Sequence, residues 1–127
     1  MINSDNMLWL NYYFDAFRNY LNFFGRATRK EYWIFTLFYY IFYFAIFIVL
    51  GQVLSGMMVS AISIIYILVS FLPVLAISIR RLHDIGKSGW WLLLILLPII
   101  GWIILFIFSV MPSEPGVNRH GPNKYGF

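Results

Sequence analysis

The chain has no cysteine and few charged residues. Only 11% of its 127 residues are Asp, Glu, Lys or Arg, against about 25% in a typical soluble protein, and 61% are hydrophobic. Without cysteine the chain can form neither disulfides nor thiolate metal sites. Its two histidines are far apart in the sequence, so we expect no metal and no cofactor. The scarcity of charge indicates that lipid surrounds much of the chain.

Two long stretches carry no charge at all, from Tyr32 to Ile79 and from Ser88 to Ser113. A helix that crosses a membrane needs about 20 apolar residues. The first stretch therefore has room for two such helices and the second for one. We predict an all-α integral membrane protein with a single membrane domain over the whole chain. Its transmembrane helices are expected at residues 32–50, 57–79 and 90–111.

Residues 7–24 precede the first span and carry polar side chains at spacings of four, three and four. These are Asn11, Asp15, Arg18 and Asn22. Such spacing places them on one stripe of a helix whose remaining surface is apolar. The pattern predicts an amphipathic N-terminal helix that lies in the membrane interface, that packs on the protein's own helices, or that does both.

Local signals set the expected ends of the first two spans. Thr28 and Glu31 have the spacing of a capping box, which predicts that a helix starts near Arg29. The second spanning helix should continue to Asp84 and stop at Gly86, because glycine readily adopts the left-handed conformation of a helix end. The two helices should then form an antiparallel hairpin. The stretch 112–127 is rich in Pro, Gly and Asn, so we expect a turn-rich tail.

Equal depth in that hairpin also predicts which side chains meet. Tyr39 should lie near Ser70, and Tyr43 near Tyr66. A phenol hydroxyl in the middle of a membrane needs a polar partner. We therefore expect at least one tyrosine hydroxyl of the first helix to bond to the second helix.

The charged residues of the chain gather in two clusters, one before the first span and one between the second and third. An antiparallel hairpin brings both clusters to the same membrane surface. Arginine has a planar fork of donors that suits phosphate. We therefore predict that four arginines bind an anionic lipid head group or a partner protein, with two acids and a histidine as ion-pair or orienting partners. The arginines are Arg26, Arg29, Arg80 and Arg81, and the partners are Glu31, His83 and Asp84.

Three classes of function fit these clusters. The first is a binding or structural module that contacts membrane lipids, further copies of the chain or a partner membrane protein. The second is a component of an oligomeric transporter or channel, although the spans contain no ionisable acid or base to line a pathway. The third is an enzyme that acts on a lipid or phosphate ester with His83 as general base, although no nucleophile or phosphate-loop motif accompanies it. Catalytic residues are therefore not assigned, and nucleic acid is not an expected partner.

The nine Lys and Arg residues also predict an orientation. With three spans, seven of them fall on one side and two, Arg119 and Lys124, on the other. The side rich in positive charge is normally cytoplasmic. We therefore predict a cytoplasmic N-terminus and a periplasmic C-terminus. Aromatic anchors at the interfaces are expected at Trp33, Trp90 and Trp91.

Several short motifs occur along the chain in a characteristic order. They are Gly25-Arg26, Arg29, Glu31-Tyr32-Trp33, Arg80-Arg81-Leu82-His83-Asp84, Ser88-Gly89-Trp90-Trp91, Pro98 with Gly101, Pro115-Gly116, Asn118-Arg119 and Gly121-Pro122. Together they resemble the domain-of-unknown-function 805 family over nearly the whole chain. That family comprises small multi-pass proteins of the bacterial inner (plasma) membrane, so the resemblance implies this location and a three-span layout. It implies no particular activity.

Overall fold

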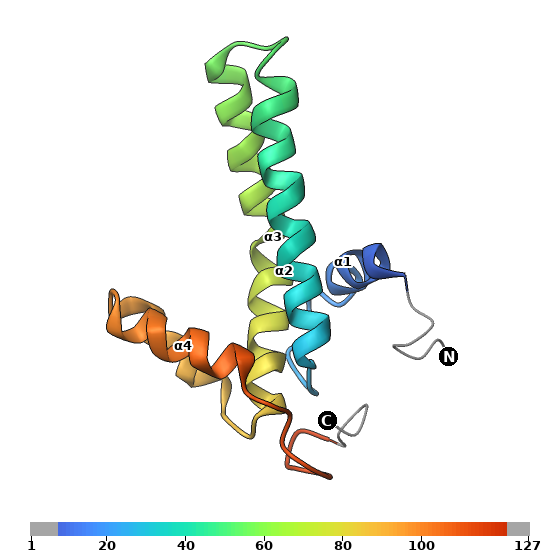
Figure 1. The fold of residues 1–127 in the computed structure, drawn as a ribbon, viewed down its shortest axis with the longest axis vertical. Helices are drawn as coiled ribbons and strands as arrows, with labels where there is room; N and C mark the ends of the chain where they lie inside the picture. Colours follow the sequence, from blue (N-terminus) through green and yellow to red (C-terminus); the bar gives the residue numbers. More distant parts are fainter. Residues whose placement is uncertain (1–7, 122–127) are drawn as a thin grey trace.

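The computed structural model describes residues 8–121. Within this range the chain is helical, and its only β-type pairing is an isolated bridge between Asn118 and Gly121. Helix α2 (Arg29–Ala45) continues as one π-helical segment, η2 (Ile46–Leu50), and then turns back into α3 (Gly56–Asp84). The two runs form the long antiparallel hairpin of Figure 1. Both are long and apolar enough to cross a membrane.

The predicted boundaries of this hairpin are confirmed. Thr28 Oγ1 accepts a hydrogen bond from the Glu31 amide at 3.1 Å, and the Glu31 side chain accepts one from the Thr28 amide at 3.4 Å. This capping box satisfies two of the amides that a helix start leaves without partners. At the other end, α3 stops before Gly86, whose φ of 82° lies in the left-handed region.

The hydroxyl contacts between α2 and α3 follow the predicted register. Tyr39 Oη lies 2.9 Å from Ser70 Oγ, and Tyr66 Oη donates to the Tyr39 carbonyl at 2.9 Å. The rings of Tyr43 and Tyr66 are 6.4 Å apart. These polar groups in the apolar part of the hairpin therefore satisfy one another, as the equal-depth argument expected.

Helix α1 (Trp9–Arg18) is shorter than the expected helix over residues 7–24, because the chain turns away after Arg18. Its Tyr13 ring packs on Phe35 and Phe42 of α2, with centroids 5.8 and 4.8 Å apart. Tyr13 Oη also lies 3.0 Å from Tyr66 Oη of α3. Helix α1 is thus packed on the protein's own helices, which was one of the two expected placements.

The expected third spanning helix over residues 90–111 is replaced by two short helices. A 3-10 helix, η3 (Gly89–Leu96), is followed by a break and then by α4 (Ile100–Val110). Pro98 has no amide hydrogen and disfavours a helical conformation at the residue before it, and Leu97 is extended. Ile99 has a φ of 68°, in the left-handed region. This local geometry ends η3 and reverses the chain.

Helices η3 and α4 form a second, shorter hairpin, which we call the lateral hairpin (residues 89–110). Trp102 Nε1 donates to the Ile95 carbonyl at 2.9 Å across it. Figure 1 shows that it leaves the α2–α3 pair sideways from the end where α2 begins and α3 stops. Because the chain returns to that end, residues 111–121 lie beside the loop before α2. The described part of the tail therefore lies at the same end of the α2–α3 hairpin as the loop before α2, whereas the three-span prediction placed it at the opposite end.

Candidate functional site at the charged end

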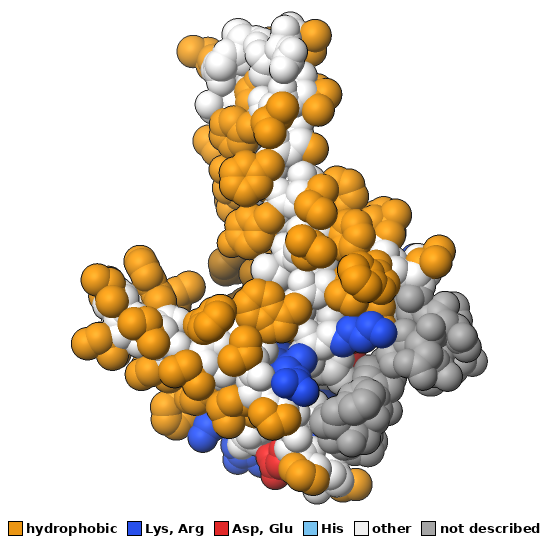
Figure 2. All heavy atoms as spheres, in the orientation of Figure 1, with side chains coloured by type: hydrophobic (Ala, Val, Ile, Leu, Met, Phe, Trp, Pro, Cys, Tyr) orange, Lys and Arg blue, Asp and Glu red, His pale blue; other side chains and the backbone are white. Residues whose placement is uncertain are grey.

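The charged end of the molecule is where α2 starts, α3 stops and the described tail returns. Figure 2 shows Lys and Arg side chains at this end and a surface of mostly hydrophobic side chains along the hairpin above it. Lys124 lies outside the described residues. The described cations here are Arg26, Arg29, Lys30, Arg80, Arg81, Lys87 and Arg119. The two clusters predicted to meet at one surface do meet.

Asp84 is the centre of a buried ion-pair network. Its side chain is fully buried and accepts from Arg26 Nε at 2.9 Å and from Arg81 Nη1 at 2.8 Å. Ser113 Oγ donates to the same carboxylate. The depth argument predicts that Asp84 contacts Arg26 or Arg29, and the structure shows the contact with Arg26. Arg81 completes an Arg–Asp–Arg triad. The antiparallel hairpin brings Arg26 and Asp84 to one depth, and the helical spacing of three places Arg81 beside Asp84.

The rest of the Arg26 guanidinium binds the tail. Its Nη1 donates to the carbonyls of Gly116 and Gly121 at 2.9 and 3.1 Å. Its Nη2 donates to the backbone carbonyls of Asp84, at 3.1 Å, and Glu114. Arg26 is therefore surrounded by protein acceptors and buried among them, so it cannot also face a ligand.

Arg81 plays the same part for the lateral hairpin. Its Nε donates to the Ser109 carbonyl at 3.2 Å, and its Nη2 donates to the Met111 carbonyl. Its Nη1 reaches the Ala27 carbonyl at 3.4 Å, in addition to Asp84. The triad thus joins the loop before α2, the end of α3, the end of α4 and the tail into one unit.

His83 is held in a structural position. Its Nδ1 lies 3.0 Å from the Gly25 carbonyl, and its ring stacks on that of His120 with centroids 3.7 Å apart. The pKa of the His120 imidazole is lowered by burial and then by repulsion from His83 and nearby arginines. The neutral ring suits the bond that its Nε2 accepts from Arg119 Nε at 3.1 Å.

The contacts of Asp84 show that it is not an orienting partner of His83. The oxygens of Asp84 are taken by Arg26, Arg81 and Ser113, so they do not orient His83 as they would in a catalytic pair. Within residues 8–121, no group of three or more acids and histidines could hold a metal ion.

Arg80 is the most deeply buried charge without a full set of partners. It is only 4% exposed, and its Nε and Nη2 have no hydrogen-bond acceptor among the described residues. Glu31 and Asp15 lie close enough to attract it electrostatically, and the Arg80 carbonyl accepts from the Ala27 amide at 2.9 Å. The depth argument predicts that Glu31 contacts Arg80 or Arg81, and the structure shows an electrostatic attraction to Arg80.

Arg29 and Lys30, at the first turn of α2, are exposed. Arg29 Nη1 makes one long bond, 3.4 Å, to the Val110 carbonyl at the end of α4. One turn further on, Trp33 Nε1 donates to the Ser109 carbonyl at 2.9 Å, and its ring meets Phe106 edge-on at 5.9 Å. These contacts join the start of α2 to the base of the lateral hairpin.

The other two tryptophans lie on η3. Trp90 is 78% exposed, whereas the Trp91 ring packs edge-on against Phe108 at 5.8 Å. The Lys87 ammonium lies 5.3 Å from the Trp91 ring centroid. Trp91 therefore helps to hold the base of the lateral hairpin, and Trp90 faces outward.

Sequence reasoning missed the acceptors supplied by the tail. Most are backbone carbonyls, at Glu114, Gly116 and Gly121, and a carbonyl has no signature in the sequence. Ser113, an unremarkable serine by sequence, also bonds to Asp84. Only the motifs shared with a known family pointed to this part of the tail.

The fold and charge distribution define a small helical membrane protein with two apolar helices long enough to span a bilayer. The chain belongs to the family described as "Protein of unknown function (DUF805)", whose sequence pattern matches residues 20–122. It is 43% identical over 118 residues to the inner membrane protein YhaI of Escherichia coli (strain K12), covering 92% of this chain and 98% of YhaI. It is 41% identical over 117 residues to the inner membrane protein YhaH of the same strain, covering 90% and 96%. No solved structure matches the chain.

Proposed function

We propose that this chain is a two-span inner-membrane protein whose charged end faces the cytoplasm and binds anionic phospholipid head groups. The observation that carries the proposal is the asymmetry of the α2–α3 pair. Two exposed cations, Arg29 and Lys30, lie where α2 begins. The turn at the other end of the pair, residues 51–55, has no charge. Positive residues favour the cytoplasmic side and attract its anionic lipids.

Apolar surfaces beside the charged end support the same placement. Helix α1 exposes Trp9, Leu10 and Phe14, and the lateral hairpin exposes large apolar side chains along both of its helices. A helix of 11 residues such as α4 is about 16 Å long, too short to cross a core of about 30 Å. On this proposal, α1 and the lateral hairpin lie in the cytoplasmic leaflet, around the cations that meet the lipid head groups.

The proposal assigns different roles to the four arginines that were expected to bind an anionic head group or a partner protein. Arg26 and Arg81 serve the buried triad, which fixes the shape of the charged end. Head-group binding then rests on the exposed cations, chiefly Arg29 and Lys30. Glu31, His83 and Asp84 act as partners within the protein.

The first expected result concerns topology. Because the chain returns after α4 to the end where α2 begins, both the loop at Gly25 and the described tail should be cytoplasmic. Reporter fusions after Phe127 and within the turn at Gly51–Gly56 measure this. The reporter that works only in the cytoplasm should be active at Phe127, and the one that works only in the periplasm should be active in the turn. The reverse at Phe127 would mean that residues 89–110 cross the membrane.

The second expected result concerns lipid preference. Each cation near an anionic membrane surface contributes about 1 kcal/mol, so the double variant Arg29→Gln with Lys30→Gln should weaken the preference for phosphatidylglycerol over phosphatidylcholine by up to about thirty-fold. Native mass spectrometry of protein titrated with each lipid measures this ratio. The matched control is Arg29→Lys with Lys30→Arg, which keeps both charges and should keep most of the preference. An equal ratio for all three proteins would contradict the proposed function.

A further inference from the structure

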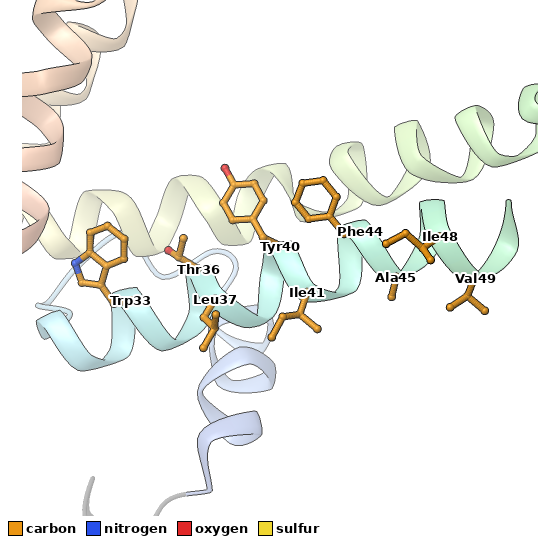
Figure 3. Close-up of a pocket in the computed structure, with 9 residues that line it drawn as sticks. All are labelled: Trp33, Thr36, Leu37, Tyr40, Ile41, Phe44, Ala45, Ile48 and Val49. Atoms are coloured by element: carbon orange, nitrogen blue, oxygen red, sulfur yellow. The ribbon is translucent and has the colours of Figure 1, made fainter.

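A long apolar groove follows the outward face of α2 (Figure 3). Its volume is about 750 Å³. The residues that line it are Trp33, Thr36, Leu37, Tyr40, Ile41, Phe44, Ala45, Ile48 and Val49. From Trp33 to Val49 it extends about 24 Å along the helix axis, at 1.5 Å per residue. It therefore covers most of the thickness of a hydrocarbon core of about 30 Å.

The groove arises from the spacing of side chains on the helix. Residues four apart form ridges on a helix surface. Figure 3 shows one ridge with Tyr40 and Phe44 on one side and another with Leu37 and Ile41 on the other. Ala45 continues the ridge of Leu37 and Ile41 and has the smallest side chain among the lining residues, so this ridge is low there and the groove is wider.

The end of the groove nearest the charged surface is rigid and positively charged. Trp33 closes this end, and its ring is held by the hydrogen bond to Ser109 and the contact with Phe106. Arg29 lies one helical turn before Trp33, at the surface, and its bond to Val110 is long at 3.4 Å. A guanidinium in this position can direct its other donors at a phosphate.

We propose that this groove binds one acyl chain of an anionic phospholipid, whose phosphate is held by Arg29. The inference rests on the proposed function, because it requires the charged end to lie at the level of the head groups. It goes further because it assigns one discrete site, in which the acyl chain lies in the apolar groove and contacts the Trp33 ring. Because contacts within the protein already hold the Trp33 ring, less conformational entropy is lost when the lipid binds.

Charge complementarity favours a lipid over a second copy of this chain. A second copy inserted in the same orientation brings its own cationic end to the level of Arg29, and like charges there repel. An anionic head group instead neutralises Arg29, and its acyl chain matches a groove whose lining carries no ionised group.

The test separates the groove from general attraction to charge. Purified, delipidated protein is titrated with phosphatidylglycerol, and the tightest single binding event is followed by native mass spectrometry. Arg29→Gln should weaken that event about tenfold, as expected for the loss of charge-assisted hydrogen bonds. Ala45→Phe, which fills the groove, should weaken it by a similar factor. Thermal unfolding of each variant checks that it is folded.

Two matched controls complete the design. Lys87→Gln removes the same charge from a half-buried cation at the same end, which does not line the groove and to which head-group binding is not assigned, and should leave the tightest event within about twofold. Leu68→Phe enlarges an outward-facing apolar residue on α3, outside the groove, and should also leave it unchanged. If Ala45→Phe and Leu68→Phe behave alike, or if Lys87→Gln weakens the event as much as Arg29→Gln, the groove is not the site.

The outcomes also distinguish this inference from the proposed function. A loss of lipid preference in the double variant of Arg29 and Lys30, without any effect of Ala45→Phe, would overturn the groove and leave head-group binding in place. If neither the double variant nor Ala45→Phe alters phosphatidylglycerol binding, both proposals fail.

Discussion

Replacing Asp84 with Asn should remove most of the folded protein. The substitution keeps the size of the side chain but leaves Arg26 and Arg81 buried without a counter-charge. Breaking a buried ion pair in this way costs about 3 to 5 kcal/mol. A domain is stable by only about 5 to 15 kcal/mol, so the loss is a large part of the total. The measurement is thermal unfolding in detergent, together with the monodisperse yield after purification.

Asp15→Asn is the matched control for this prediction. It makes the same chemical change at a half-buried acid of α1, whose described charge partner is the more distant attraction to Arg80. A partly solvated pair contributes at most about 1 kcal/mol. Asp15→Asn should therefore lower the unfolding temperature much less than Asp84→Asn. Equal effects would mean that the triad does not hold the charged end together.

Replacing Gly101 with Ala should open the lateral hairpin. A Cβ at this position would lie 1.8 Å from the Leu94 carbonyl oxygen and 3.0 Å from the Leu97 Cβ. The obstacle is backbone, so the two helices must move apart, and we expect a loss of about 3 kcal/mol or more. A loss of stability would be informative, because a Gly to Ala substitution within a helix normally raises the stability by about 1 kcal/mol. Thermal unfolding measures the loss, and the rate of thiol labelling of Leu94→Cys, at a half-buried position that faces Gly101, measures opening of the hairpin.

Gly56→Ala provides the control, since it places the same methyl group on a helical glycine with nothing within 4 Å. It should be neutral or slightly stabilising. The labelling experiment is clean because the natural chain has no cysteine. If Gly101→Ala is as stable as Gly56→Ala and labels no faster, the close contact of η3 with α4 does not exist in the membrane-embedded protein.

The long hairpin could be predicted from the sequence because each of its determinants is local. The charge-free run from Tyr32 to Ile79 marks the spans, Thr28 and Glu31 mark a start, and Gly86 marks a stop. Once the two helices are antiparallel, depth alone brings Tyr39 to Ser70. Nothing in these steps requires knowledge of a distant contact.

The lateral hairpin could not be predicted in the same way. The hydropathy of a segment does not depend on the path of the chain. A run of 22 apolar residues that folds back on itself therefore has the same hydropathy as a run of 22 that crosses a membrane. The reversal depends on the left-handed Ile99 and on the approach of Gly101 to Leu94, both of which are properties of the folded backbone. Pro98 was visible, but membrane helices also tolerate proline in their interiors.

The ion pairs of the charged site could be predicted from the sequence, but the burial of its arginines could not. Helix ends at one depth were enough to pair Asp84 with Arg26 or Arg29. The burial of Arg26 and Arg81 depends instead on carbonyls of the tail and of the end of α4, which the three-span layout placed at the opposite end of the hairpin. The three-span prediction therefore left Arg26 and Arg81 open to a ligand, whereas the structure buries both side chains.

The contacts of Arg26 also set the order in which the protein can be completed during synthesis. Arg26 precedes both spans, whereas its acceptors at Glu114, Gly116 and Gly121 are made after the lateral hairpin. A nascent chain that has inserted α2 and α3 can pair Arg26 with Asp84, but its remaining guanidinium donors must stay hydrated. The charged end therefore cannot close over Arg26 until residues 114–121 have been synthesised.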